Sequence, residues 1–360
     1  MRASDRILVT RFKSIGDILF TLPAIHALRE HFPERKITFL TSQEFAPLLA
    51  GFRDVNEVVS IDRSLFRGGN LVHMAQEMCS LMAFLHQRKF SLAVDFQGYG
   101  ETALITLLTR APQRWGTVYQ SARGYAYTRG IRRDPGTHPA EANLQLLLEC
   151  GITLASVRND FVLPEDSMAK ARELFALLGL DARKPTLFIQ PFTSSAHKNW
   201  PLENYLALAN YWRAAGFQVL FGGGPGELPR LQPVCDAGFP VSAGASLLVS
   251  AGLTKLCSVI VGGDTGLLHI AVAMNKRVVL IQGPHRHPER FYPFQHPEWK
   301  LMPPAGEPIS SVSIREVLKA TETAFADRGY QFAAEVAGGE SAFVGPRPEP
   351  KRESLVASAA

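Results

Sequence analysis

The chain has 360 residues, 46% of them hydrophobic, with a formal net charge of +5 and an isoelectric point near 9.0. This length suits two domains of ordinary size. Four scattered cysteines without a Cys-x-x-Cys pair argue against structural zinc and for a reducing compartment. No uncharged apolar run reaches the about 18–20 residues of a membrane helix, and Ile7–Val9 is too short for the core of a signal peptide. We therefore expect a cytoplasmic protein, able to contact a membrane face peripherally, that prefers anionic ligands and does not bind nucleic acid.

The first 165 residues alternate between β-prone runs and segments with helical spacing. Apolar residues of Ile18–Phe32 share one helix face, and Pro23 fits a first turn if this helix begins near Leu22. Such alternation predicts a doubly wound α/β domain over residues 1–165. The expected strands are Arg6–Thr10, Lys36–Leu40, Glu57–Ile61 and Leu92–Asp95, and the expected helices are Ile18–Phe32, Phe45–Ala50, Leu71–Gln87, Thr102–Thr109 and Ala140–Gly151.

The same rhythm returns over residues 186–330, after an interdomain passage at 166–185 with a helix around Ser167–Leu178. We expect an α/β protein in which two Rossmann-like domains with parallel sheets face a central cleft. Residues 331–360 are rich in Ala, Gly, Glu and Pro, which predicts a disordered tail. The expected strands of the second domain are Thr186–Gln190, Gln218–Phe221, Ser258–Val261 and Val278–Ile281, and the expected helices are Pro201–Ala215, Leu267–Met274 and Arg315–Ala326.

The strongest signal for a ligand site is the turn Asp264-Thr265-Gly266, between a predicted strand and a predicted helix. Free N–H groups and the helix dipole favour an anion at such a turn. Thr265 can cap the helix or offer its hydroxyl to a phosphate, Gly266 lets a phosphate approach, and His269 faces the same end. The alternative is that Asp264 or Thr265 only caps the helix and that His269 is a satisfied buried histidine.

Two more loops follow predicted strands of the second half. One carries Thr193, Ser194 and Lys198, whose hydroxyls and positive charge suit a diphosphate; the alternative is a polar turn with an exposed lysine. The other, Gly222–Glu227, has glycines that permit close approach of the backbone, and its glutamate can accept hydrogen bonds from a ribose or base. It contains neither a GxGxxG fingerprint nor a P-loop.

In the first half, Asp17 lies between a predicted strand and a predicted helix. A carboxylate there normally complements the helix dipole. One that reaches an acceptor hydroxyl, and that no salt bridge neutralises, can act as a general base. Residues 110–133 hold six arginines and no acidic residue. This stretch is either a solvated basic loop or a partner for phosphates and carboxylates.

We expect no metal and no cofactor. His285 and His287, separated by one arginine, are typical of a polar loop, and the sequence has no Asp-x-Asp pair to hold a divalent ion against a sugar diphosphate. The charge of a leaving group would then be met by Lys198, hydroxyls and helix N-termini.

Five motifs follow one another along the chain: Ile7–Leu28, Lys198–Pro201, Gly222–Glu227, Ser242–Gly244 and Gly263–His269. They resemble the motifs of the lipopolysaccharide heptosyltransferases, glycosyltransferase family 9. The resemblance implies a GT-B fold and an inverting, metal-independent transfer of heptose. The implied donor is ADP-heptose, and the implied acceptor is the lipopolysaccharide inner core or a related surface glycan, an anionic glycolipid reached at the inner membrane face.

The resemblance also implies a role for each matching residue. Asp17 matches the general base and Lys198 the cation at the departing diphosphate, so Asp17 and His269 must open onto one cavity. The implied donor-binding residues are Thr193, Ser194, Lys198, Glu227, Asp264, Thr265, Gly266 and His269, and the implied acceptor-binding residues are Arg11, Lys13, Ser14, Gly16, Arg114 and Arg123.

The chain departs from the family pattern in two places. The turn Gly283-Pro284 is followed by His285 instead of threonine, and the tail after Gln331 is not a family feature. Two other functions remain open: a sugar-nucleotide epimerase or hydrolase of the same fold, which needs no acceptor, and a non-catalytic nucleotide-sugar-binding protein.

Overall fold

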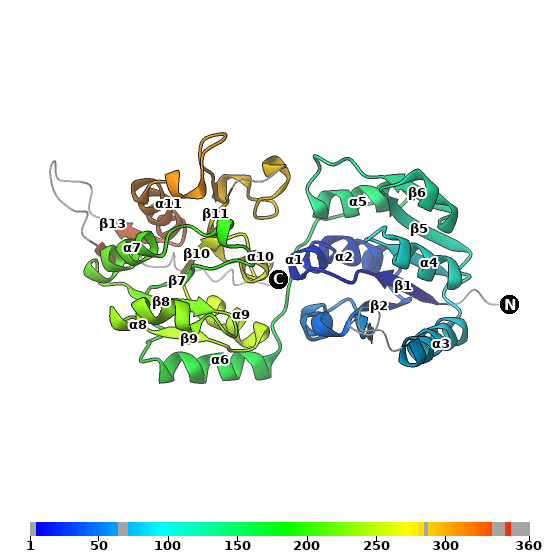
Figure 1. Cartoon of the computed structure of the whole chain (residues 1–360), viewed down its shortest axis with the longest axis horizontal. Helices are drawn as coiled ribbons and strands as arrows, with labels where there is room; N and C mark the ends of the chain where they lie inside the picture. The colour runs from blue at the N-terminus through cyan, green and yellow to red at the C-terminus, as the bar shows by residue number, and fades with distance from the viewer. Residues whose placement is uncertain (1–4, 64–70, 284–286, 333–342, 347–360) are drawn as a thin grey trace, which may run out of the picture.

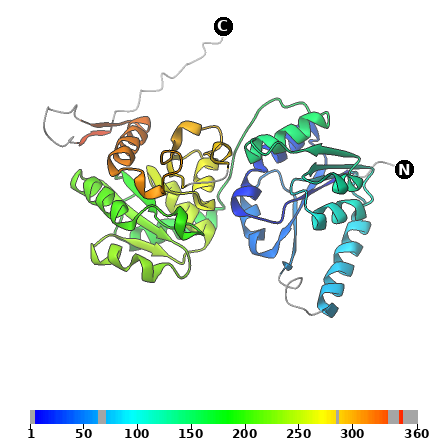
Figure 2. The same cartoon turned by 45° about the horizontal axis from the view of Figure 1, so that its top comes forward.

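The computed structural model describes residues 5–63, 71–283, 287–332 and 343–346. These residues form two halves that lie side by side, each built on a six-stranded parallel sheet with helices around it (Figure 1, Figure 2). The predicted fold class, α/β with two parallel sheets, is confirmed.

The first sheet is formed, in spatial order, by β3 (Glu57–Ile61), β2 (Lys36–Ser42), β1 (Arg6–Thr10), β4 (Leu92–Asp95), β5 (Gln113–Val118) and β6 (Arg129–Arg132). β1 is apolar and almost wholly buried, as expected for a central strand covered by helices on both faces. The helices of this half are α1 (Ile15–Leu19), α2 (Leu22–His31), α3 (Leu71–Arg88), α4 (Gly100–Leu108) and α5 (Pro139–Glu149), with 3-10 segments at Gln43–Gly51 and Ser121–Ala126.

The second sheet is formed, in spatial order, by β12 (Lys300–Leu301), β11 (Arg277–Ile281), β10 (Val259–Gly263), β7 (Thr186–Gln190), β8 (Gln218–Gly223) and β9 (Val241–Ala243). Both sheets share one topology, in which the chain starts at a central strand and later returns to its other side. The order reverses between β1 and β4 and between β7 and β10, the places where parallel sheets bind ligands. The helices of this half are α6 (Glu165–Leu177), α7 (Leu202–Ala214), α8 (Gln232–Asp236), α9 (Leu247–Leu256), α10 (Gly266–Ala273) and α11 (Ile314–Asp327).

Three element predictions need correction. The single helix expected over Ile18–Phe32 is two helices, α1 and α2, and Pro23 lies in the first turn of α2. The arginine-rich stretch 110–133 is not a plain loop, because it contains β5 and β6. The short strands β9 and β12 and the apolar helix α9 were not predicted. β6 is mostly exposed, so it lacks the apolar alternation by which a strand is recognised.

The connection between the halves is bonded to both of them. Phe161 donates its N–H to the Ala273 carbonyl at 2.9 Å, and Val162 donates to the Gly51 carbonyl at 3.0 Å. α6, which falls in the predicted interdomain passage, packs against α9 of the second half. A hydrophobic cluster that includes β1, α2, α9 and α10 continues through this region. The halves therefore share buried apolar surface.

Of the predicted tail, residues 331–332 and 343–346 are described by the structure, and they belong to two short strands. β13 (Tyr330–Phe332) pairs antiparallel with β14 (Phe343–Pro346) in a separate two-stranded sheet. Residues 333–342 and 347–360, together with Pro284, His285 and Arg286, lie outside the described residues.

Candidate active site

A cavity of about 480 Å³ lies between the two halves, beside the residues that follow β1 and β10. Both strands border a point where strand order reverses, so the cavity lies where this topology predicts a ligand. Its volume suits a small-molecule site, and Asp17 and His269 both open onto it. It is lined from the first half by Arg11, Ser14, Ile15, Gly16, Asp17, Phe20, Phe45, Tyr99, Tyr119 and Arg133, and from the second by Ser194, Lys198, Asp264, Thr265, Gly266, His269, Arg290 and Phe291.

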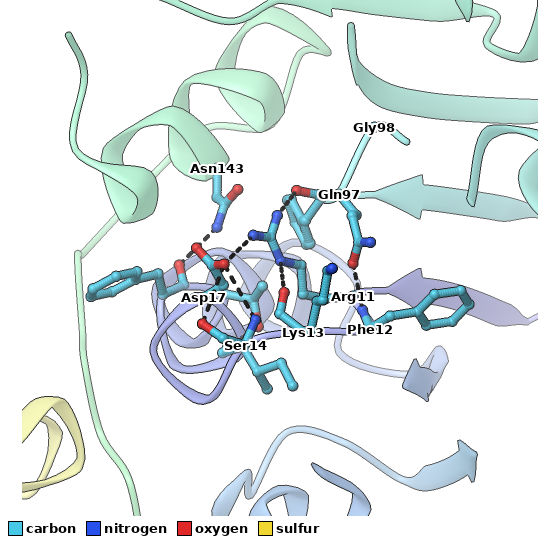
Figure 3. A network of polar contacts seen from close by, with 12 residues as sticks. Arg11, Phe12, Lys13, Ser14, Asp17, Gln97, Gly98 and Asn143 are labelled. Carbon is cyan, nitrogen blue, oxygen red and sulfur yellow. Dashed lines mark hydrogen bonds and ion pairs between the residues drawn. The ribbon is translucent and has the colours of Figure 1, made fainter. Parts of the chain in front are cut away.

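Arg11 fixes Asp17 at the cavity wall (Figure 3). The Arg11 guanidinium lies 2.8 Å from the Asp17 carboxylate and also donates to the carbonyls of Lys13 at 3.0 Å and Phe96 at 2.6 Å. Ser14 adds a backbone N–H at 3.3 Å and a hydroxyl at 3.4 Å to the same carboxylate. Arg11 is buried, whereas the Asp17 side chain is 33% exposed. The carboxylate is therefore held from behind with one side open to the cavity.

The ion pair sets the protonation of Asp17. Burial alone would raise the pKa of the Asp17 carboxyl, but the charge and hydrogen bond of Arg11, with the Ser14 N–H, outweigh it and hold that pKa below its usual value. Asp17 is therefore ionised at neutral pH. The expectation that no salt bridge neutralises a general base here is not met in this structure, so Asp17 is a weaker base than a free carboxylate.

The opposite wall is the start of α10. Thr265 caps this helix, because its hydroxyl accepts the N–H of Leu268 at 3.5 Å. His269 is buried, and its Nε2 lies 2.9 Å from Oδ1 of Asp264. Capping by Thr265 and a satisfied histidine were the plainer interpretation of these residues, and the structure shows both. Both residues nevertheless line the cavity together with Gly266, so the ligand interpretation stays open.

α1 and α10 approach each other closely across the two halves, and glycine permits it. A Cβ on Gly266 would lie 2.4 Å from Cγ2 of Ile15, which is too close for a real contact. A Cβ on Gly16 would lie 3.3 Å from Cδ2 of His269. The Phe20 ring packs edge-on against the His269 imidazole, with ring centroids 4.8 Å apart. This packing places the starts of both helices at one cavity.

The predicted donor residues divide into two groups. Ser194 and Lys198 line the cavity, and no acidic side chain of the described ranges forms an ion pair with Lys198. Thr193 is buried away from the cavity, where its hydroxyl is 2.9 Å from Oδ1 of Asn199. The Glu227 carboxylate accepts the N–H of Gly224 at 2.7 Å and stabilises its own loop. Thr193 and Glu227 therefore support these turns and do not line this cavity.

Half of the predicted acceptor residues do not line the cavity. Arg114 donates to the carbonyls of Ala126 and Ala111 within the 110–133 stretch, and Arg123 donates to the carbonyl of Gly98, which ties this stretch to the loop after β4. Neither lines the cavity, and Lys13 does not either. Ser14, Gly16 and Arg11 do line it, but the Arg11 guanidinium is engaged as described above.

Four polar or charged lining side chains were not among the predicted site residues. Arg133 belongs to the arginine-rich stretch but was not singled out in it, and Tyr99 and Tyr119 are both 43% exposed. Arg290 ends a 3-10 turn, Pro288–Arg290, in the second half. No motif distinguishes Arg290 in the sequence, because its place at the cavity depends on how the halves meet.

The described residues show neither a candidate metal cluster nor a membrane-spanning helix. Across residues 5–63, 71–283, 287–332 and 343–346, no cluster of three or more His, Cys, Asp or Glu side chains could hold a metal ion. His287, the described member of the predicted histidine pair, lies 3.3 Å from Glu289. In the same ranges no helix has both the length and the apolar character to cross a bilayer.

Solved structures identify the fold. A glycosyltransferase family 9 protein from Veillonella parvula superposes with a TM-score of 0.80 at 20% identity, covering 89% of this chain and 97% of that one. The Escherichia coli heptosyltransferase WaaC, solved with ADP, superposes with a TM-score of 0.73 at 21% identity, covering 89% and 99%. The fold is therefore that of the two-domain GT-B glycosyltransferases.

Sequence comparison gives the family. The model of glycosyltransferase family 9 (heptosyltransferase) matches residues 78–301, and this chain belongs to that family. Lipopolysaccharide heptosyltransferase 3 of Escherichia coli K12 is 23% identical over 283 residues, which is 76% of this chain and 80% of the relative. The protein is thus a heptosyltransferase-like enzyme, as the sequence motifs predicted.

Proposed function

We propose that this protein transfers a heptose from ADP-heptose to the lipopolysaccharide inner core or to a related surface glycan, with inversion and without a metal ion. Family membership supports the class of reaction. The relative WaaC was solved with ADP and with ADP-2-deoxy-2-fluoro heptose, which supports this donor. Because such an acceptor is anchored in lipid, the protein works from the cytoplasm at the inner membrane face.

The observation that carries the proposal is a single cavity whose two walls offer complementary chemistry. The first half supplies the ionised Asp17. The second supplies Lys198, Ser194 and the start of α10. An anion at a helix start beside a lysine is stabilised by backbone N–H groups and by charge. A donor diphosphate on the second wall therefore directs its sugar toward Asp17.

The chemistry follows from that arrangement. The acceptor hydroxyl oxygen bonds to the anomeric carbon while the bond from that carbon to the β-phosphate oxygen breaks. The hydroxyl proton passes to Asp17, and ADP departs with the bonding electron pair, its charge met by Lys198 and the α10 N–H groups. Although Arg11 makes Asp17 a weak base, the hydroxyl becomes strongly acidic as its oxygen bonds to carbon. Proton transfer late in the step therefore remains favourable.

The direct test measures ADP release and product mass with ADP-heptose, with and without lipopolysaccharide that lacks its inner-core heptose. Transfer only with the acceptor, unchanged by a chelator, is the expected result. Turnover of ADP-heptose alone would favour the epimerase or hydrolase. Stabilisation by ADP-heptose without product from any acceptor would favour a binding protein.

A further inference from the structure

Arg133 and Arg290 come from different halves and line the same cavity. Arg133 directly follows β6, and Arg290 ends the turn Pro288–Arg290. Nε and Nη2 of Arg133 and Nε of Arg290 are shielded from solvent and have no hydrogen-bond partner among the described residues. A shielded N–H without a partner is costly, above all on a charged group, so such groups normally bind a ligand or water.

The remaining contacts of these arginines hold them beside the cavity. Arg133 donates through Nη1 to the Tyr119 hydroxyl at 2.6 Å. Arg290 donates through Nη1 to the Pro135 carbonyl at 3.3 Å, so it reaches across to the first half. Each contact uses one end of the guanidinium and leaves its other N–H groups free. A planar fork presented in this way matches a carboxylate or phosphate.

The charge balance of the cavity also favours an anion. Its lining has four cations, Arg11, Arg133, Lys198 and Arg290, and two carboxylates, a formal balance of +2. Both carboxylates already have partners, Asp17 in Arg11 and Asp264 in His269. Burial, and then the charge of Arg133, lowers the pKa of Arg290, so a nearby anion would relieve an existing repulsion.

We propose that Arg133 and Arg290 form an anion site, shared by the two halves, for a carboxylate or phosphate carried by the acceptor sugar. This inference rests on the proposed function. The rings of Tyr99 and Tyr119, with centroids 5.9 Å apart, line the same cavity and offer apolar faces to that sugar. Because the site needs an arginine from each half, a bound acceptor holds the halves together around the reacting atoms.

Kinetics of Arg133→Gln and Arg290→Gln test the assignment to the acceptor. Each variant should raise the KM for acceptor about 10-fold or more, with the KM for ADP-heptose and the Kd of ADP unchanged. Arg132→Gln is the matched control, because Arg132 is exposed on β6 and does not line the cavity. An unchanged acceptor KM overturns the proposal. A rise in donor KM instead would assign the pair to the diphosphate.

A binding measurement separates this site from the transfer reaction itself. With ADP saturating, inorganic phosphate should raise the melting temperature of the wild type and of Arg132→Gln, and much less that of Arg133→Gln or Arg290→Gln. No phosphate effect in the wild type, or an equal effect in all four proteins, overturns the anion site. If both variants lose the phosphate effect but the wild type transfers no heptose, the anion site is supported and the proposed function is not.

Discussion

Arg11 shows, at the scale of single residues, how a buried side chain sets the chemistry of another. The sequence identified both Arg11 and Asp17 as site residues, but it gave them separate roles. In the structure they are an ion pair, and Arg11 also donates to the Phe96 carbonyl, in the loop after β4. This second contact joins segments that lie far apart in the chain, so local sequence could not show it.

Lys198 is the residue whose removal should most directly weaken donor binding. It lines the cavity, and among the described residues it forms no ion pair that would occupy its charge. Lys198→Ala should raise the Kd for ADP about 10- to 100-fold, since a hydrogen bond to a charged group contributes about 1.5–3 kcal/mol. Isothermal titration calorimetry measures this, with the exposed Lys184→Ala as control. Equal affinity in both variants would remove Lys198 from the donor site.

At the scale of elements, the α1–α10 contact positions the site. Gly266→Ala would place a Cβ 2.4 Å from Ile15, whose branched side chain cannot move aside without shifting α1. We expect a loss of about 1–3 kcal/mol of stability, as for other overpacked contacts, together with reduced transfer. The control Gly100→Ala has open space around its Cβ and should be neutral or slightly stabilising. If thermal unfolding and activity were the same for both, α1 and α10 would not need this close approach.

Strands were predictable from sequence where burial requires a continuous run of apolar residues. β1, β7, β10 and β11 are apolar runs buried within the sheets, and each was expected close to its observed position. β6 was missed because it is an exposed strand at the edge of its sheet, with arginine at both ends and no apolar face to read. The site followed the same rule in part. Polar lining residues on the loops after β1 and β10 were predicted, whereas Tyr99 after β4 and Arg290, whose place depends on the meeting of the two halves, were not.

For the whole molecule, His138 links the two halves in its neutral form. Its Nδ1 accepts the N–H of Ala140 at 3.1 Å, so its proton is on Nε2, which donates to the Tyr292 carbonyl of the other half at 3.3 Å. Burial, and then the charge of His269, lowers the pKa of His138 to about 3. The unfolded chain takes up this proton near pH 6.5 and the folded chain does not, so stability falls as pH drops from 6.5 toward 3.

Replacing His138 should flatten that pH dependence. Asparagine keeps the cap of α5 but cannot titrate. Between about pH 7 and about pH 5 the free energy of unfolding should fall by about 2 kcal/mol more in the wild type than in His138→Asn. Urea unfolding at both pH values gives the two differences. Parallel profiles would show that His138 does not keep its neutral form in the folded protein.

The central claim is that Asp17 takes the proton of the acceptor hydroxyl in a cavity whose other wall holds the nucleotide. The most direct measurement compares Asp17→Asn with wild type for heptose transfer and, separately, for the Kd of ADP, with the exposed Asp236→Asn as control and a thermal melt to verify folding. We predict that Asp17→Asn slows transfer at least about 100-fold and binds ADP as wild type does. Wild-type transfer by folded Asp17→Asn would contradict the account.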